Sequence, residues 1–198
     1  MSLANSIRKE FTTLSLVLIP VGMVLNIVVG QLASTLKLPI FLDSIGTMLV
    51  ALLVGPWAGA LTGFLGNLIW GLITDPVAAP FALVALVIGL VTGLLARVGF
   101  FRQWWQAGVS GVIVTLALAP VAILIRTYLF GGVTGSGADF LTAYLLQVGQ
   151  DLFGAVVVTV ITSNLADKVV TALLAWGLVK YLPQRFTARF PGAERVIG

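Results

Sequence analysis

Residues 38–47 (LPIFLDSIGT) and 53–63 (LVGPWAGALTG) contain the pattern that decides the fold. Two apolar runs meet at the pair Gly55-Pro56, and such a pair is typical of a tight turn. One acidic residue, Asp43, stands at the start of the first run. The pattern predicts two apolar helices joined by a short turn, with a carboxylate at the opposite end of the first helix.

The composition places these helices in a membrane. The chain has 198 residues, of which 59% are hydrophobic and only 9% are charged, and its mean hydropathy is +1.11. A soluble domain with this composition would expose large apolar patches to water and aggregate. We therefore expect an all-α integral membrane protein that forms a single domain over residues 1–198.

Several kinds of chemistry are excluded by residue types that the chain lacks. The sequence contains no cysteine and no histidine, so we expect no disulfide, no thiolate or Ser-His nucleophile and no His-ligated metal. It also contains no G-x-x-x-x-G-K-[ST] motif, so the chain should not hydrolyse ATP by itself. We expect no enzyme activity, no cofactor and no metal. The net charge of +4 is interpreted as membrane-flanking bases rather than a surface for nucleic acid.

Seven apolar segments are long enough to consider as membrane helices, since a spanning helix needs about 20 mostly apolar residues. They cover residues 12–34, 41–55, 57–74, 79–99, 106–130, 139–162 and 164–182.

The positions of the bases predict how many of these segments cross. Basic residues cluster before the first segment, after the fourth and at the C-terminal end. The positive-inside rule puts all three clusters in the cytoplasm, which requires six crossings with both termini cytoplasmic. Segment 139–162 carries Gln147, Gln150 and Asp151, which are costly against lipid, so we expect it to be re-entrant or outside. The alternative is that 41–55 is re-entrant because it is short. The clusters are Arg8 and Lys9; Arg97 and Arg102; and Lys180, Arg185, Arg189 and Arg195.

With this topology the interior polar residues gather near the outer face. An ionisable group inside a membrane indicates a functional site, because its desolvation needs a partner or a cavity. We therefore predict a polar, partly aromatic cup that opens outward and binds a substrate. The candidate residues are Asn26, Gln31, Asp43, Asn67, Trp70, Arg126, Tyr128, Gln147, Asp151, Asn164, Asp167 and Lys168.

Structural roles remain open for several of these side chains. Asp43 could cap a helix N-terminus, and Trp70 could belong to an interfacial aromatic belt. Arg126 could pair with Asp151 or Asp167 and hold the bundle together. Asp167 and Lys168 point about 100° apart on a helix, so each is expected to need its own partner. Lys37, Asp75 and Asp139 fit either as interfacial loop residues that water already solvates or as members of structural ion pairs.

A row of small residues offers a second signal. Gly55, Gly59 and Gly63 recur at four-residue intervals, and such rows let helices approach closely in lipid. The row could pack inside the bundle or form a docking surface for another membrane subunit. We predict that these three glycines belong to a docking surface for a partner subunit.

The opening stretch resembles the second and third helices of S components, the substrate-binding membrane subunits of energy-coupling factor (ECF) transporters. Its GPxxG turn, with an acidic residue about a dozen positions upstream, is the most specific feature. Residues 163–168 (SNLADK) are similar to the polar start of the family's sixth helix. The resemblance implies a six-helix bundle in a prokaryotic cytoplasmic membrane. It also implies import driven by a separate transmembrane coupling subunit with two ATPase subunits. The family's A-x-x-x-A docking motif is not evident here.

The resemblance favours a small, water-soluble, partly planar substrate: a vitamin, a vitamin precursor, a nucleobase or a nucleoside. Trp70 and Tyr128 could stack on a ring, while Asn67, Asn164 and Gln147 could read its donors and acceptors. Two other functions remain open, namely a stand-alone ion-coupled carrier or channel and a non-transporting assembly subunit. In a carrier, Asp43, Asp151 and Asp167 would be the coupling sites.

Overall fold

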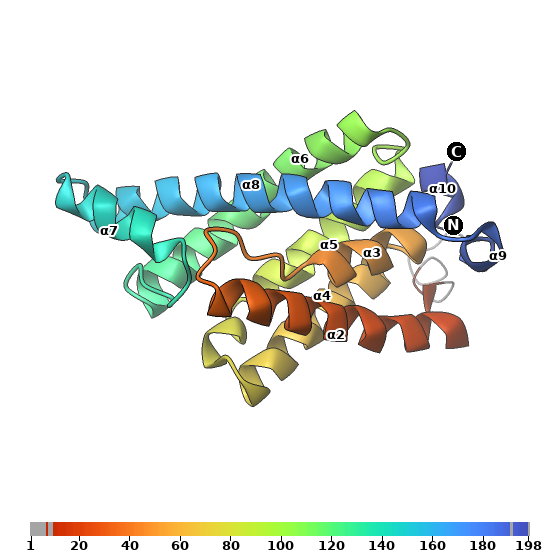
Figure 1. Ribbon diagram of the computed structural model, residues 1–198, viewed down its shortest axis with the longest axis horizontal. Helices are drawn as coiled ribbons and strands as arrows, with labels where there is room; N and C mark the ends of the chain where they lie inside the picture. Colours follow the sequence, from red (N-terminus) through yellow and green to blue (C-terminus); the bar gives the residue numbers. More distant parts are fainter. Residues whose placement is uncertain (1–6, 8–9, 191, 198) are drawn as a thin grey trace.

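The computed structural model describes residues 7, 10–190 and 192–197, and this part of the chain is helical without any strand (Figure 1). Arg8 and Lys9, which entered the topology prediction, lie outside the described residues. The elements are α2 (Thr13–Thr35), α3 (Ile45–Leu53), α4 (Pro56–Ile73), a 3-10 turn η1 (Pro76–Ala78), α5 (Ala82–Arg97), α6 (Trp104–Leu124), a π-helical turn η2 (Ile125–Leu129), α7 (Asp139–Gln147), α8 (Leu152–Tyr181), α9 (Gln184–Thr187) and α10 (Glu194–Ile197).

The turn between α3 and α4 is as short as the sequence predicts. It contains only Val54 and Gly55, and Gly55 has a φ of 150°, which favours glycine. Pro56 begins α4, where its missing N–H costs nothing. The buried carboxylate of Glu10 accepts hydrogen bonds from the N–H groups of Trp57 (2.8 Å) and Ala58 (3.1 Å) and so caps the helix.

Helix α3 lies at the centre of the bundle, in contact with α2, α4, α5 and α8. Its side chains from Met48 to Leu53 are almost all fully buried, as expected for a short helix that is apolar on all sides. The two most extensive helix contacts are those of α4 with α5 and of α6 with α8.

The small-residue row packs inside this bundle. A Cβ atom at Gly59 would lie 2.5 Å from the Cβ of Ala51, and one at Gly63 would lie 2.5 Å from the carbonyl oxygen of Ala85. Gly55 is buried against Glu10 in the same way. The candidate docking role for Gly55, Gly59 and Gly63 is therefore wrong: other helices of the same chain already cover all three.

The two segments expected at 139–162 and 164–182 are divided differently in the structure. Helix α8 runs without a break through residue 163, because its polar side chains bond back to the helix. The side-chain amide of Asn164, for example, donates to the carbonyl of Val160 (2.9 Å). The earlier part of the first segment forms α7, which packs back on α8 through a hydrogen bond between Thr142 and Thr159 (3.0 Å). With 30 residues, α8 is about 45 Å long, which exceeds a hydrocarbon core of about 30 Å.

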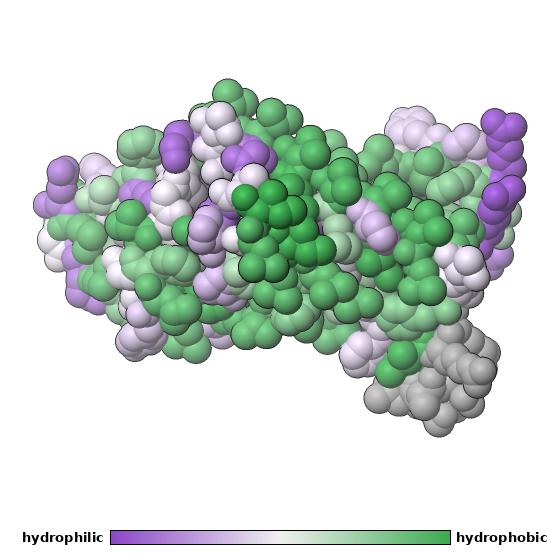
Figure 2. Space-filling view, turned by 90° about the horizontal axis from the view of Figure 1, so that it is seen from below, coloured by the Kyte–Doolittle hydropathy of each residue, from purple (hydrophilic) through white to green (hydrophobic). Residues whose placement is uncertain are grey.

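Three helices in the described part are long and apolar enough to cross a membrane: α2, α6 with its π-helical extension, and α8. Figure 2 shows hydrophobic residues over the middle of the molecule and hydrophilic residues mostly toward its two ends, as in a membrane protein. The count of six crossings stays a prediction.

Candidate functional site

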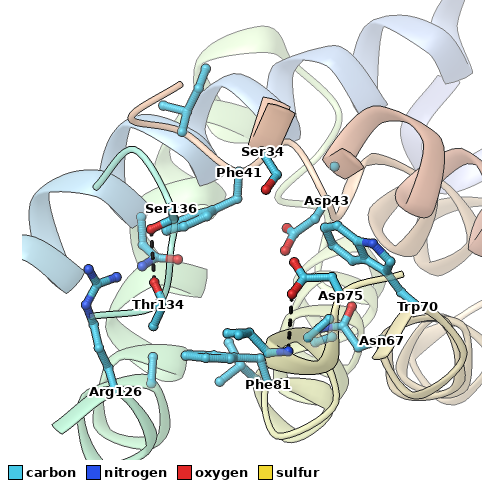
Figure 3. Close-up of a pocket in the computed structure, with 18 of the residues that line it drawn as sticks. Ser34, Phe41, Asp43, Asn67, Trp70, Asp75, Phe81, Arg126, Thr134 and Ser136 are labelled. Carbon is cyan, nitrogen blue, oxygen red and sulfur yellow. Dashed lines mark hydrogen bonds between the residues drawn. The ribbon is translucent and has the colours of Figure 1, made fainter. Parts of the chain in front are cut away.

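A cavity with about 910 Å³ of empty space, including its mouth, lies near the end of the bundle opposite the start of α2 and the end of α8 (Figures 1 and 3). Its walls come from the C-terminal ends of α2 and α4, the start of α5, the end of α6 and the middle of α8. Three connecting segments, 36–44, 74–81 with η1, and 130–138, complete them. Phe41, Trp70 and Phe81 give the cavity an aromatic lining.

A buried ionic cluster stands at one wall, between α3 and α8. Lys168 is 1% exposed, and its ammonium group donates to Ser44 Oγ (2.6 Å), Asp43 Oδ1 (3.3 Å) and the carboxylate of Asp167. A buried cation is tolerated when it is paired and hydrogen-bonded in this way. The expectation that Asp167 and Lys168 need different partners is wrong, because the flexible lysine side chain bends back to its neighbour's carboxylate.

Asp167 also shapes the loop that precedes α3. Its Oδ1 accepts hydrogen bonds from the N–H groups of Phe41 (3.0 Å) and Leu42 (2.7 Å). Leu42 has a φ of 53°, which a branched residue rarely adopts, and these bonds hold it there. The loop in turn places Phe41 and Asp43 on the cavity wall. Asp43 is not the N-cap of α3, since Ser44 occupies that position.

Two polar residues of α2 support the cavity wall by hydrogen bonds without lining the cavity. Asn26 accepts hydrogen bonds from the N–H groups of Gly46 (2.7 Å) and Thr47 (3.2 Å), and so satisfies the start of α3. Gln31 accepts a hydrogen bond from the indole N–H of Trp70 (3.0 Å), which fixes the orientation of that ring in the cavity.

Arg126 lies in the π-helical turn η2 and holds the opposite wall of the cavity in place. It donates through Nε to the carbonyl of Gly132 (3.0 Å) and pairs with Asp139. The carboxylate of Asp139 also accepts from the N–H groups of Thr134 (3.0 Å) and Gly135 (2.6 Å). Pairing of Arg126 with Asp151 or Asp167 is therefore wrong, whereas Asp139 forms a structural ion pair, which is one of the two structural roles expected for it.

Six of the twelve sequence candidates line the cavity: Asp43, Asn67, Trp70, Arg126, Asn164 and Lys168. Asn26, Gln31 and Asp167 support its walls by the bonds described above. The other three candidates lie elsewhere on the surface. Tyr128 is 72% exposed, and Gln147 and Asp151 are exposed at the end of α7 and the start of α8.

Several lining residues were not among the sequence candidates: Ser34, Phe41, Asp75, Phe81, Thr134 and Ser136 (Figure 3). Asp75 is an acidic residue at the end of a predicted helix, which could indicate a site residue, but its sequence position fits a solvated loop equally well. Nothing in the sequence distinguishes Phe41 and Phe81 from other membrane phenylalanines.

Fold and site together define a helical membrane protein with a mostly apolar cavity into which a few polar side chains project. The family model described as "ECF transporter, substrate-specific component" matches residues 14–179. This match covers well over half of the chain, so the protein belongs to that family, whose members are the substrate-binding subunits of transporters. Neither the curated proteins nor the solved structures contain a match to the chain.

Proposed function

We propose that the protein binds one small, water-soluble molecule in the cavity from the outer side of the membrane and delivers it inward. The observation that carries this proposal is the cavity itself, which Asn67, Trp70 and Asn164 all line from within the helices. A few polar groups converging on an apolar, aromatic pocket are typical of a small-molecule site. The substrate classes that we propose are a vitamin, a vitamin precursor, a nucleobase or a nucleoside.

The charges support an outward-facing cavity. The ends of α5 and α8 that lie away from the cavity carry basic residues: Arg97 and Lys180 lie in the last turns, and Arg102 and Arg185 follow them. The positive-inside rule assigns those ends to the cytoplasm, which leaves the cavity on the outer side, accessible to a substrate outside the cell.

Contacts between loops 36–44 and 130–138 suggest how the substrate is enclosed. The ammonium group of Lys37 donates to the carbonyl oxygen of Gly135 (2.5 Å), and Gly137 is so close to the carbonyls of Lys37 and Leu38 that a Cβ atom would not fit. Loops 36–44 and 130–138 therefore touch over the cavity. Substrate entry requires them to separate, and they close again over the bound molecule.

The energy for import comes from partner subunits in this proposal. The sequence carries no Walker A motif, so ATP hydrolysis is assigned to two ATPase subunits acting through a transmembrane coupling subunit. The buried glycine row is excluded as the docking surface.

The test is to purify the full chain and identify retained ligand by native mass spectrometry, and then to measure the affinity of that ligand for variants. We expect Asn67→Ala and Asn164→Ala to weaken binding, whereas Gln147→Ala, an exposed control on α7, leaves it unchanged. If both asparagine variants bind as tightly as the wild type, the cavity is not the substrate site. Cellular uptake without the ATPase subunits would contradict the coupling mechanism.

A further inference from the structure

Acidic groups outnumber basic groups around the cavity, although the whole chain has a net charge of +4. Two cations, Arg126 and Lys168, line it. Each pairs with an acid behind the wall: Asp139 for Arg126 and Asp167 for Lys168. The lining then contains two further carboxylates: one shares Lys168 with Asp167, so that this cluster holds two acids for one cation, and the other forms no ion pair with the described residues.

These two carboxylates are Asp43 and Asp75, and Figure 3 shows them pointing into the cavity toward one another. Asp43 accepts hydrogen bonds only through Oδ1, from the hydroxyl of Ser44 (3.1 Å) and from the ammonium group of Lys168, which also donates to Asp167. Asp75 uses only Oδ1, which accepts from the N–H of Val77 (3.2 Å), and it forms no ion pair within the described part of the chain. Each therefore presents one carboxylate oxygen without a partner among the described residues.

An independent observation at the same place also points to a ligand. Asn67 is 4% exposed and lines the cavity beside Asp75 and Trp70 (Figure 3). Among residues 10–190, its side-chain amide has no hydrogen-bond partner. The amide faces the cavity, where a bound molecule can supply the hydrogen bond that the described residues do not.

Charge and geometry together identify the kind of molecule that completes this wall. When the loops close, two facing carboxylates lose water and repel each other unless a positive charge lies between them. The indole ring of Trp70, held by Gln31, presents an aromatic face of the kind that attracts cations. An anionic ligand would add to the repulsion.

We propose that the substrate is a flat aromatic molecule that carries a positively charged, N–H-donating nitrogen group. The cationic group lies between Asp43 and Asp75, Asn67 bonds to it or to the adjacent ring, and the ring lies among Trp70, Phe41 and Phe81. This inference rests on the proposed function, since it names the substrate class of the same cavity.

Three probes of equal size and different charge test the proposal: benzamidine, which is a cation at neutral pH, benzamide, which is neutral, and benzoate, which is an anion. Their binding to the full chain in lipid nanodiscs is measured by calorimetry and by quenching of tryptophan fluorescence. We expect benzamidine to bind at least about tenfold more tightly than benzamide, equivalent to roughly 1.4 kcal/mol, and benzoate to bind most weakly.

Variants assign the preference to the two carboxylates. Asp75→Asn preserves the hydrogen bond from Val77 and removes only the charge, so it should fold normally and reduce the preference for benzamidine by about tenfold. Asp43→Asn should act in the same direction. Asp151→Asn is the matched control, because Asp151 is exposed, caps α8 and lies outside the cavity; it should change nothing.

The outcomes separate this inference from the function on which it rests. Equal or tighter binding of benzamide or benzoate, abolished by Trp70→Ala, overturns the cationic class and leaves the cavity as the binding site. A benzamidine preference that survives both aspartate variants also overturns it. Failure of all three probes, together with no retained ligand in native mass spectrometry, overturns both proposals.

Discussion

The two ends of the bundle use similar groups for different purposes. At the end near the start of α2, the buried Glu10 pairs with Arg97 through one carboxylate oxygen and caps α4 through the other. At the cavity end, Asp43 and Asp75 each keep one oxygen without a partner among the described residues. Both ends hold carboxylates near helix termini. The comparison indicates that an acid near a helix end is structural when both of its oxygens are satisfied inside the chain, and is available to a ligand when one oxygen is left without a partner.

The largest effect on stability and binding at the cavity end is expected from Lys168→Met, which removes the cation of the ionic cluster. This change leaves Asp167 buried at 0% exposure without its cation. Because an uncompensated buried charge is costly, we expect a loss of about 3–5 kcal/mol in the free energy of unfolding, together with loss of substrate binding. Thermal unfolding in detergent and a binding assay measure the two effects. Normal stability in this variant would contradict the role assigned to the ionic cluster.

A change at the other end should affect stability alone. Glu10→Ala removes both the cap of α4 and the partner of Arg97, so we expect a loss of about 2–3 kcal/mol with unchanged affinity per folded molecule. Thermal unfolding and ligand titration on the same sample separate the effects. Glu194→Ala, at an exposed acid, is the control. A large loss of affinity in Glu10→Ala would show that the two ends are coupled.

Asn67→Ala should weaken substrate binding without lowering stability, which is the reverse of the effect expected for Glu10→Ala. The amide makes no hydrogen bond with the described residues, so the variant loses no internal bond and should unfold at the temperature of the wild type. Its affinity for the substrate should fall about tenfold, as expected for one buried hydrogen bond of roughly 1.4 kcal/mol. Calorimetry measures the affinity, with Gln147→Ala alongside. A destabilised variant with normal affinity would make Asn67 a structural residue.

The smallest effect is expected from Gln31→Ala. Gln31 does not line the cavity; its side-chain oxygen orients the Trp70 ring and also accepts a hydrogen bond from the exposed hydroxyl of Thr74 (3.1 Å). Losing the bond to Trp70 should weaken substrate binding about threefold, because part of a single hydrogen bond's value is lost. Tryptophan fluorescence should shift as the indole reorients. Gln150→Ala, at an exposed glutamine, should leave both quantities unchanged.

The sequence predicted the helices better than their ends. The turn at Gly55-Pro56 was confirmed because glycine and proline restrict the backbone locally. The break expected near residue 163 is absent because polar side chains can satisfy themselves on their own helix, as Asn164 does. Periodicity and composition do not distinguish a polar helix interior from a helix end.

The candidate site was predicted in part for a similar reason. Three residues were predicted as site residues because they lie at the same depth along the helices, and all three line the cavity: Asp43, Asn67 and Lys168. Depth alone does not say which way a side chain points, so Tyr128 was included although it is exposed. Asp75 was left out because loop residues and cavity residues have the same composition.

By itself, the sequence determined that this is a helical membrane protein of the substrate-specific ECF family, because apolar content and local turn residues act over short stretches of chain. Only the tertiary structure decided which polar groups meet. The bond from Leu42 to Asp167 joins residues 125 positions apart, and close contacts at Gly59 and Gly63 set how near the helices approach. Such partners depend on helix packing and side-chain direction, so the cavity and its two available carboxylates emerge only when the bundle is assembled.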